Sequence, residues 1–252
     1  MRKIAFIFAA IASVLLFTRC ASTDTATSDN VNQSEIHQSY TVVYDANDKE
    51  LSATATFRFG GPTGTTLSLA KPSIVSFNGE AMSVENSVFT GTYYKMAKQT
   101  GFVNSCTFVF IDTQKKEYIN TAPLMAAEIS EYPTNTDKAT GFTINWDDPL
   151  RPGETVTFNI EDGKSNTASV SVNTQGATRL SVKPEDLKEI ETGPCRVWLV
   201  RVSELALKQA THLEGELSVK YVSEKRWINI SGTLAAIKKS GKTRKYSGRM
   251  KE

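Results

Sequence analysis

The sequence predicts an all-β protein built from two tandem antiparallel β-sandwich domains. From residue 39 onward, apolar and polar residues alternate, which is the period of a strand with one buried face. Turn signals, of which Asn78-Gly79 is the strongest for a hairpin, recur about every eight to twelve residues. About 213 residues remain beyond residue 38, which is enough for one large or two ordinary domains.

Residues 1–19 have the layout of a signal peptide. Arg2 and Lys3 precede a run, IAFIFAAIASVLLF, that is apolar except for one serine. As a helix this run spans about 21 Å, which is shorter than the roughly 30 Å core of a bilayer. We therefore expect cleavage rather than a permanent membrane span.

The segment LLFTRC, residues 15–20, resembles the lipobox of bacterial lipoproteins. The resemblance implies cleavage before Cys20 and attachment of acyl chains to that residue. Arg19 departs from the pattern, which normally has a small residue there, and no conventional small-residue cleavage site fits better. The alternative is a secreted or periplasmic protein in which Cys20 is a spare cysteine.

Two terminal segments are expected to lie outside the folded domains. Residues 20–38 are small and polar, so we predict a disordered tether. Residues 235–252 form a basic tail that either contacts an anionic surface or is simply solvated. Its bases are Lys238, Lys239, Lys242, Arg244, Lys245, Arg249 and Lys251.

The first predicted sandwich comprises residues 39–126. Residues 51–59 alternate strictly, and the apolar run CTFVFID indicates a central strand followed by a partner. The second predicted sandwich comprises residues 139–234, after a linker that contains Pro133. Its central strand is CRVWLVRV, and ELSVKYVSEKRWINI is interpreted as a closing hairpin.

Roughly seven short strands in each half fit an immunoglobulin-like sandwich, although the Cys…Trp…Cys spacing of antibody domains is absent. The stretches ATATFRFGGPTGTTLSLAKPSIVSFNGEAM and LKEIETGPCRVWLVRV resemble uncharacterised tandem immunoglobulin-like lipoproteins of Gram-negative bacterial envelopes. The resemblance implies a fold and a compartment. It contains no catalytic motif, so it assigns no functional residues.

The remaining cysteines, Cys106 and Cys195, are placed in different domains within apolar strands. We favour two free buried thiols over a bridge between domains, although export permits a disulfide. Without its signal segment the chain is close to neutral, and an exported chain is not expected to bind nucleic acid.

Few residues are candidates for catalysis or metal binding. The two histidines, His37 and His212, are too few for a His-based triad or a multi-His zinc site. Asp147 and Asp148 are adjacent and would point in opposite directions on a strand. We therefore expect no catalytic residues, no metal and no cofactor.

Three aromatic residues are the candidate ligand contacts. Trp227 faces away from its apolar neighbours, and Tyr93 and Tyr94 place one ring on each face of their strand. Packing at a sheet edge or between domains is the alternative role for these rings.

The predicted function is non-catalytic binding or scaffolding by a lipid-anchored protein of the bacterial cell envelope. The predicted location is the outer membrane, through the lipid anchor; without the anchor, the protein would be periplasmic or secreted. Its partners would be the membrane, through the N-terminal lipid, and an envelope protein or glycan. The alternatives are a surface glycan-binding module, with Trp227 and Tyr93 on one surface, and an envelope glycan hydrolase or its accessory protein. A hydrolase requires paired acids, one with a raised pKa, in a cleft.

Overall fold

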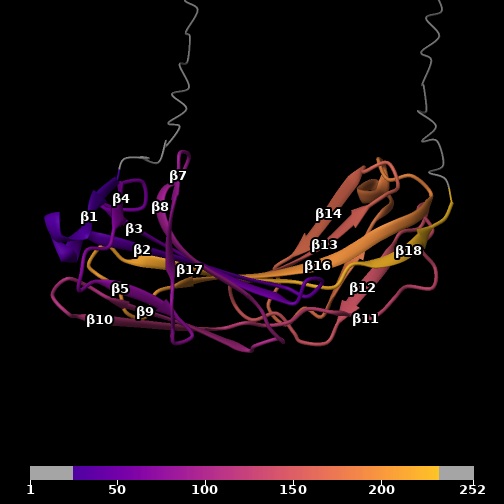
Figure 1. Cartoon of the computed structure of the whole chain (residues 1–252). Coiled ribbons are helices and arrows are strands. Elements are labelled where there is room, and N and C mark those ends of the chain that lie inside the picture. Colours follow the sequence, from indigo (N-terminus) through magenta and orange to yellow (C-terminus); the bar gives the residue numbers. More distant parts are fainter. Residues whose placement is uncertain (1–24, 233–252) are drawn as a thin grey trace, which may run out of the picture.

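The computed structural model describes residues 25–232. The regular elements in this range are strands, apart from three short 3-10 helices, so the predicted all-β class is confirmed (Figure 1). The strands of the first part of the chain are β1 (Thr25–Thr27), β2 (Ile36–Asp45), β3 (Glu50–Phe59), β4 (Thr65–Ser68), β5 (Ile74–Phe77), β6 (Glu80–Ala81), β7 (Ser83–Ser87), β8 (Gly91–Gln99), β9 (Ser105–Ile111) and β10 (Glu117–Pro123). Those of the second part are β11 (Ile129–Glu131), β12 (Phe142–Trp146), β13 (Glu154–Glu161), β14 (Thr167–Val172), β15 (Arg179–Val182), β16 (Gly193–Ala206), β17 (Gly215–Val222) and β18 (Arg226–Ile230). Three short 3-10 helices accompany them: η1 (Ser28–Asn30), η2 (Gln33–Glu35) and η3 (Pro184–Leu187).

One large sheet runs through the whole molecule. Its strand order is β1-β4-β3-β2-β17-β16-β13-β14. In addition, β8 pairs with β3, β7 pairs with β8, and β18 pairs with β16. A sheet of order β10-β9-β5-β6 covers one part of it, and a sheet of order β11-β12-β15 belongs to the other part. Most neighbouring strands are antiparallel, as predicted, but β1 with β4 and β2 with β17 are parallel pairs.

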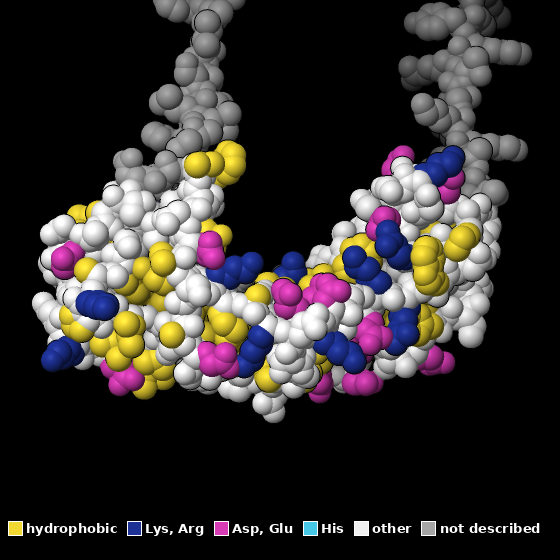
Figure 2. All heavy atoms as spheres, in the orientation of Figure 1, with side chains coloured by type: hydrophobic (Ala, Val, Ile, Leu, Met, Phe, Trp, Pro, Cys, Tyr) yellow, Lys and Arg dark blue, Asp and Glu magenta, His cyan; other side chains and the backbone are white. Residues whose placement is uncertain are grey.

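The buried apolar residues form two separate cores, and we call the parts built around them the first and second lobes. The first core contains Tyr40, Phe57 and Phe108, and the second contains Trp146 and Phe158. The alternation that predicted the strands is also visible in burial, because inward positions of β3 and β13 are buried and the positions between them are partly exposed. The lobes rise as two arms on either side of a hollow (Figures 1 and 2).

The cysteines of the two cores are free and buried. Cys106 belongs to the first core and Cys195 to the second. Burial raises the pKa of Cys106 to about 12 and also raises the pKa of Cys195. Both therefore behave as small hydrophobic residues, as predicted, since a nucleophilic cysteine needs a lowered pKa.

The predicted closing hairpin at the end of the chain is wrong. Strands β17 and β18 do not pair with each other; both pair with β16, over residues 200–206 and 193–197 respectively. The interruption between them includes Ser223, whose Oγ accepts a hydrogen bond of 2.8 Å from the Leu199 N–H. Strand β16 is long enough to cross from one core to the other, so two short strands lie end to end along one of its edges.

Strand β17 consequently belongs to the first lobe. It lies parallel to β2, and its inward residues Leu217, Val219 and Tyr221 are part of the first core. Ile228 and Ile230, on β18, are part of the second core. The predicted second domain, residues 139–234, thus contributes one strand to the core of the first, residues 39–126.

The predicted tether, residues 20–38, is also wrong for the part that the structure describes. Residues 25–38 form β1, η1, η2 and the start of β2, and Ile36 is fully buried. Polar side chains satisfy the backbone in this segment: Gln33 Nε2 donates to Val31 O at 2.9 Å, and Ser28 Oγ accepts from the Ala70 N–H at 2.9 Å. Polar composition did not prevent packing, because these groups find partners. The predicted signal peptide, residues 20–24 and the basic tail lie outside the described residues.

Candidate functional site

The structure places Trp227 where the sequence predicts it. Its side chain is 66% exposed on β18, while its neighbour Ile228 is buried. The guanidinium carbon of Arg196, which is opposite Trp227 in the register, lies 5.9 Å from the ring centroid. Whether Trp227 contacts a ligand stays a prediction, and Cys20 lies outside the described residues.

Tyr94 does not face solvent. It is buried in the first core, its ring packs edge-on against Phe57, and its hydroxyl accepts a hydrogen bond of 2.6 Å from the Leu69 N–H. A ligand contact through Tyr94 is therefore excluded by its packing. Tyr93 is half-buried, and its strand β8 belongs to the first lobe whereas Trp227 belongs to the second, so the structure does not bring these two residues together (Figure 1).

The remaining polar candidates stay scattered. Asp147 and Asp148 are exposed in the loop after β12, and His212 is exposed in the loop before β17. His37 is buried, with Nδ1 3.2 Å from Leu213 O. Among residues 25–232, His, Cys, Asp and Glu form no group of three that could hold a metal ion. The same range contains no helix that is both long and apolar enough to cross a membrane.

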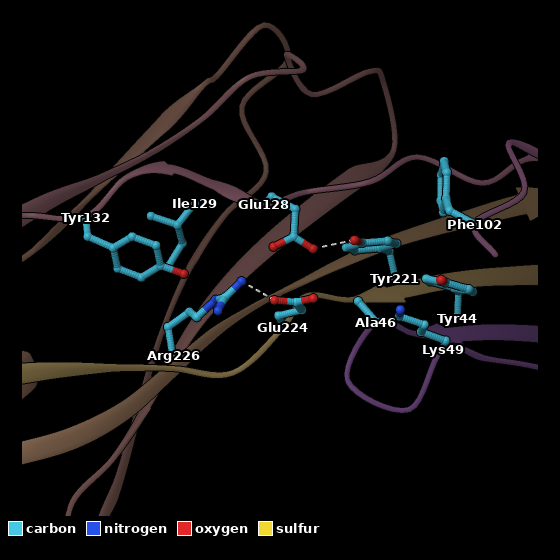
Figure 3. Close-up of a pocket in the computed structure, with 10 residues that line it drawn as sticks. All are labelled: Tyr44, Ala46, Lys49, Phe102, Glu128, Ile129, Tyr132, Tyr221, Glu224 and Arg226. Atoms are coloured by element: carbon cyan, nitrogen blue, oxygen red, sulfur yellow. Dashed lines mark hydrogen bonds and ion pairs between the residues drawn. The ribbon is translucent and has the colours of Figure 1, made fainter. Parts of the chain in front are cut away.

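A pocket that the sequence did not predict lies at the junction of the two lobes (Figure 3). We call it the junction pocket; its volume is about 440 Å³. It is built from the end of β2, the turn after β2, the loop before β9, the linker around β11 and the interruption between β17 and β18. It is lined by Tyr44, Ala46, Lys49, Phe102, Glu128, Ile129, Tyr132, Tyr221, Glu224 and Arg226.

Three aromatic rings form one wall of the junction pocket. Tyr44 and Tyr221, which are neighbours across the parallel pair of β2 and β17, stack with their centroids 5.7 Å apart. Phe102 packs edge-on against both, at 5.5 Å from Tyr44 and 5.6 Å from Tyr221. Phe102 comes from a loop and remains 45% exposed. Tyr44 and Tyr221 are buried, so within this wall Phe102 presents the aromatic surface that solvent reaches, and the two tyrosines hold its ring in place.

Two carboxylates face each other beside this wall (Figure 3). Glu128 accepts a hydrogen bond from the Tyr221 hydroxyl, and Glu224 forms an ion pair with Arg226. Burial raises the pKa of Glu128; the hydrogen bond from Tyr221 lowers it in part, and the charge of Glu224 raises it further. Burial and the contact with Glu128 raise the pKa of Tyr221, so this hydroxyl remains a donor at neutral pH.

A second hollow adjoins the junction pocket. Its volume is about 420 Å³, and Trp227 lines it together with Asn135 and Asn229. Tyr132 lines both spaces, and Trp227 lines only the second hollow. Trp227, which the sequence predicted to be exposed, thus lines a hollow next to the junction pocket, which the sequence did not predict.

The residues of the junction pocket come from segments far apart in the chain, which explains why no motif revealed them. The available signals were single aromatic residues in expected loops, Phe102 in TGFVNS and Tyr132 in the linker. Bulky rings in such polar segments need either a packing partner or a function.

Comparison with known proteins gives no family, since no family model and no curated protein matches the chain. Solved structures do match. A tetra-tandem repeat in the extending region of a large adhesion protein is 11% identical, with 77% of this chain and 49% of that chain covered and a TM-score of 0.25. A 1.5-MDa bacterial ice-binding adhesin is 9% identical, with 79% and 65% covered and a TM-score of 0.21.

SGBP-B of the Bacteroides ovatus mixed-linkage glucan utilization locus, solved with a mixed-linkage heptasaccharide, is 9% identical, with 74% of this chain and 55% of that chain covered and a TM-score of 0.23. This chain therefore spans less than two thirds of the length of each of the three. All three TM-scores are below 0.5.

Proposed function

We propose that the protein is a lipid-anchored, non-catalytic binding protein of the bacterial cell envelope, and that the junction pocket binds a carbohydrate chain. The anchor rests on the resemblance of residues 15–20 to a lipobox ending at Cys20. The binding role rests on one observation: the partly exposed ring of Phe102, packed on the buried Tyr44 and Tyr221, stands beside two facing carboxylates in a pocket of about 440 Å³. Pockets of this size bury small ligands.

This combination of groups suits a sugar. Aromatic rings offer flat apolar faces against which the C–H faces of a pyranose can stack. Carboxylates accept hydrogen bonds and guanidinium groups donate them, so Glu128, Glu224 and Arg226 can bind sugar hydroxyl groups. The second hollow, which Tyr132 shares with the junction pocket and Trp227 also lines, would be the place for a further sugar unit.

The half-buried carboxyl group of Glu128 supports a functional role. Burial raises its pKa, which means that the folded structure disfavours the charged form. An apolar residue there would avoid this cost but would leave the Tyr221 hydroxyl without its acceptor. A carboxyl group with a raised pKa at a pocket is a candidate functional group.

Hydrolysis of a glycan is the second candidate function, favoured by the same two acids. A glycosidase needs a pair of carboxyl groups of which one has a raised pKa, and Glu128 beside Glu224 has that form. Against it, each acid is already engaged, Glu128 by Tyr221 and Glu224 by Arg226. These contacts position the acids as binding groups.

The test of the binding role uses the purified Cys20→Ala protein on an array of bacterial, plant and animal glycans, followed by calorimetric titration with the glycans retained. We expect Phe102→Ala to weaken binding about tenfold, because one aromatic contact is lost. Phe89→Ala is the matched control, since Phe89 is an exposed ring on a strand hairpin elsewhere. Retention of no glycan at millimolar concentration, or an equal effect of both substitutions, contradicts the proposal.

Hydrolysis is tested in the same samples. The retained glycan is incubated with the protein and new reducing ends are measured. We expect none. If the wild type releases reducing ends and Glu128→Gln does not, the protein is a hydrolase and the non-catalytic binding role is wrong.

The lipid anchor is tested separately, by detergent phase partition and the N-terminal mass of the mature protein. We expect the wild type to enter the detergent phase with an acylated Cys20 and Cys20→Ala to stay aqueous. If both stay aqueous and cleavage occurs elsewhere, the anchor is wrong.

A further inference from the structure

The turn between β7 and β8 exposes the two least buried large apolar side chains of residues 25–232. Val88 is 83% exposed and Phe89 is 84% exposed, and nearly all of β7 is exposed as well. The residues from Asn86 to Gly91 carry no charge. We call Val88 and Phe89 the apolar tip; Figure 2 shows hydrophobic side chains at the end of this arm. Two neighbouring apolar side chains at such exposure cost solubility and contribute nothing to the core, which indicates a contact surface.

The apolar tip lies close to the point where the described chain begins. Thr25 Oγ1 is 3.2 Å from Thr92 Oγ1 and 3.3 Å from Thr66 Oγ1. Thr92 follows Phe89 by three positions in the β7–β8 hairpin. β1, β4, β7 and β8 occupy the same arm in Figure 1.

The distance from this point to the proposed lipid is short. Cys20 precedes Thr25 by five positions, and a fully extended chain spans at most about 3.6 Å per residue, so the two residues lie within about 18 Å of each other. Acyl chains on Cys20 enter a bilayer, which therefore lies within that reach of the start of β1. The apolar tip stands beside that start.

We propose that the apolar tip inserts into the surface of the bilayer that holds the acyl chains of Cys20, as a second membrane contact that orients the first lobe. This inference rests on the lipid anchor of the proposed function. Apolar side chains gain free energy at the boundary of headgroups and acyl chains, and two rather than one membrane contact give stable attachment. The anchor makes insertion an intramolecular event, so even a small apolar tip is effective.

The experiment separates insertion of the apolar tip from native lipidation. The mature protein starting at Cys20 is coupled through the Cys20 thiol to a maleimide lipid in phosphatidylcholine vesicles. Phosphatidylcholine is zwitterionic, so the vesicle surface has no net charge that the basic tail could bind. Cys106 and Cys195 are buried and do not compete. Phe89→Trp then reports the environment of the apolar tip, with the parent protein as background and Phe102→Trp as the matched control in another exposed loop.

We expect the Phe89→Trp emission to shift to shorter wavelength on coupled vesicles and to be quenched by brominated phosphatidylcholine. Neither change is expected for Phe102→Trp. Unchanged Phe89→Trp emission on coupled vesicles overturns the proposal. Because the coupling replaces the natural acyl chains, a failure of native lipidation is detected only in the N-terminal mass and cannot be confused with this result.

A second variant measures the contribution to attachment. With a single-chain maleimide lipid, whose membrane binding is weak and reversible, Val88→Ser/Phe89→Ser should lower the vesicle-bound to free ratio at least about tenfold. The double variant should unfold at the same temperature as the parent, because both side chains are exposed. Unchanged partition overturns membrane insertion. A change of the free protein from dimer to monomer would assign the tip to a second copy of the chain instead.

Discussion

Arg201 and Glu154 form a buried ion pair at the place where the two lobes meet. Both side chains are 2% exposed, and Arg201 Nε lies 3.2 Å from Glu154 Oε2. Arg201 also donates to Ala126 O at 3.1 Å, in the linker, and to Pro149 O at 3.0 Å, in the loop after β12. One guanidinium therefore joins β16, the first residue of β13, the linker and a loop.

Removal of Arg201 alone should destabilise the protein strongly. Arg201→Met leaves Glu154 buried without its cation, which costs about 3–5 kcal/mol in free energy of unfolding. Urea denaturation monitored by tryptophan fluorescence measures the change. The double variant Arg201→Met/Glu154→Leu should lose less than Arg201→Met alone, since neither charge is then left without a partner.

The control for this pair is the more exposed ion pair of Arg196 and Glu161, with a distance of 2.9 Å. Arg196→Met should cost about 1 kcal/mol or less. If Arg196→Met and Arg201→Met lower the free energy of unfolding equally, burial of the ion pair is not the cause of the loss of stability.

Asp162 should stabilise its turn more than Asp112 stabilises a similar one. In both turns the aspartate Oδ1 accepts the N–H of the second and fourth following residues. Asp162 Oδ2 also accepts from the Glu191 N–H at 2.9 Å and from Asn166 Nδ2 at 2.8 Å, whereas Asp112 Oδ2 has no hydrogen-bond partner among the described residues. Asp162→Asn should therefore cost about 1–3 kcal/mol more than Asp112→Asn in chemical denaturation.

The advantage of Asp162 should disappear in acid. Burial acts to raise the pKa of Asp162, but its hydrogen bonds outweigh this effect and lower the pKa from 3.8 to about 2. A carboxyl with a lowered pKa contributes stability above its unfolded value, and the contribution is lost as the pH falls through the folded value. The difference in stability between wild type and Asp162→Asn should shrink from pH 5 to about pH 2. A constant difference over that range would contradict this pKa.

Glu128→Gln should stabilise the protein and weaken ligand binding. Burial raises the pKa of Glu128, so its charged form is a cost above that pKa and the cost vanishes as the pH falls toward the unfolded value. We expect a gain of up to about 1 kcal/mol at pH 7, limited because the side chain is only half-buried, and none near pH 4. Thermal denaturation at the two pH values measures it, and glycan titration measures the loss of binding. Lower stability at pH 7 would show that Glu128 is a structural residue.

The strands could be predicted from sequence, but the way in which they are shared between the cores could not. Alternation identifies which residues of β3, β13 and β17 face inward, because burial of one face imposes a period of two. It does not identify which core an inward residue joins. Leu217 on β17 and Ile228 on β18 have the same pattern, yet they join different cores, because the two strands pair with different parts of β16. The junction pocket was missed for the same reason, because only tertiary contacts bring Tyr44, Phe102 and Tyr221 together.

The first lobe should not fold without the end of the chain. A fragment of residues 25–126 contains β1 to β10 but lacks β17, which lies between β2 and β16 and adds Leu217, Val219 and Tyr221 to the first core. Without it, β2 exposes an unpaired edge along residues 38–45, and the stacking of Tyr44 on Tyr221 is lost. Three missing core side chains, each worth about 2–5 kcal/mol, together match the whole stability of an ordinary domain, about 5–15 kcal/mol. We expect amide hydrogen exchange of the fragment to be unprotected or the fragment to aggregate, whereas β2 and β3 are protected in the full chain. A monomeric fragment with native protection in β2 would show that the first lobe is an independent domain after all.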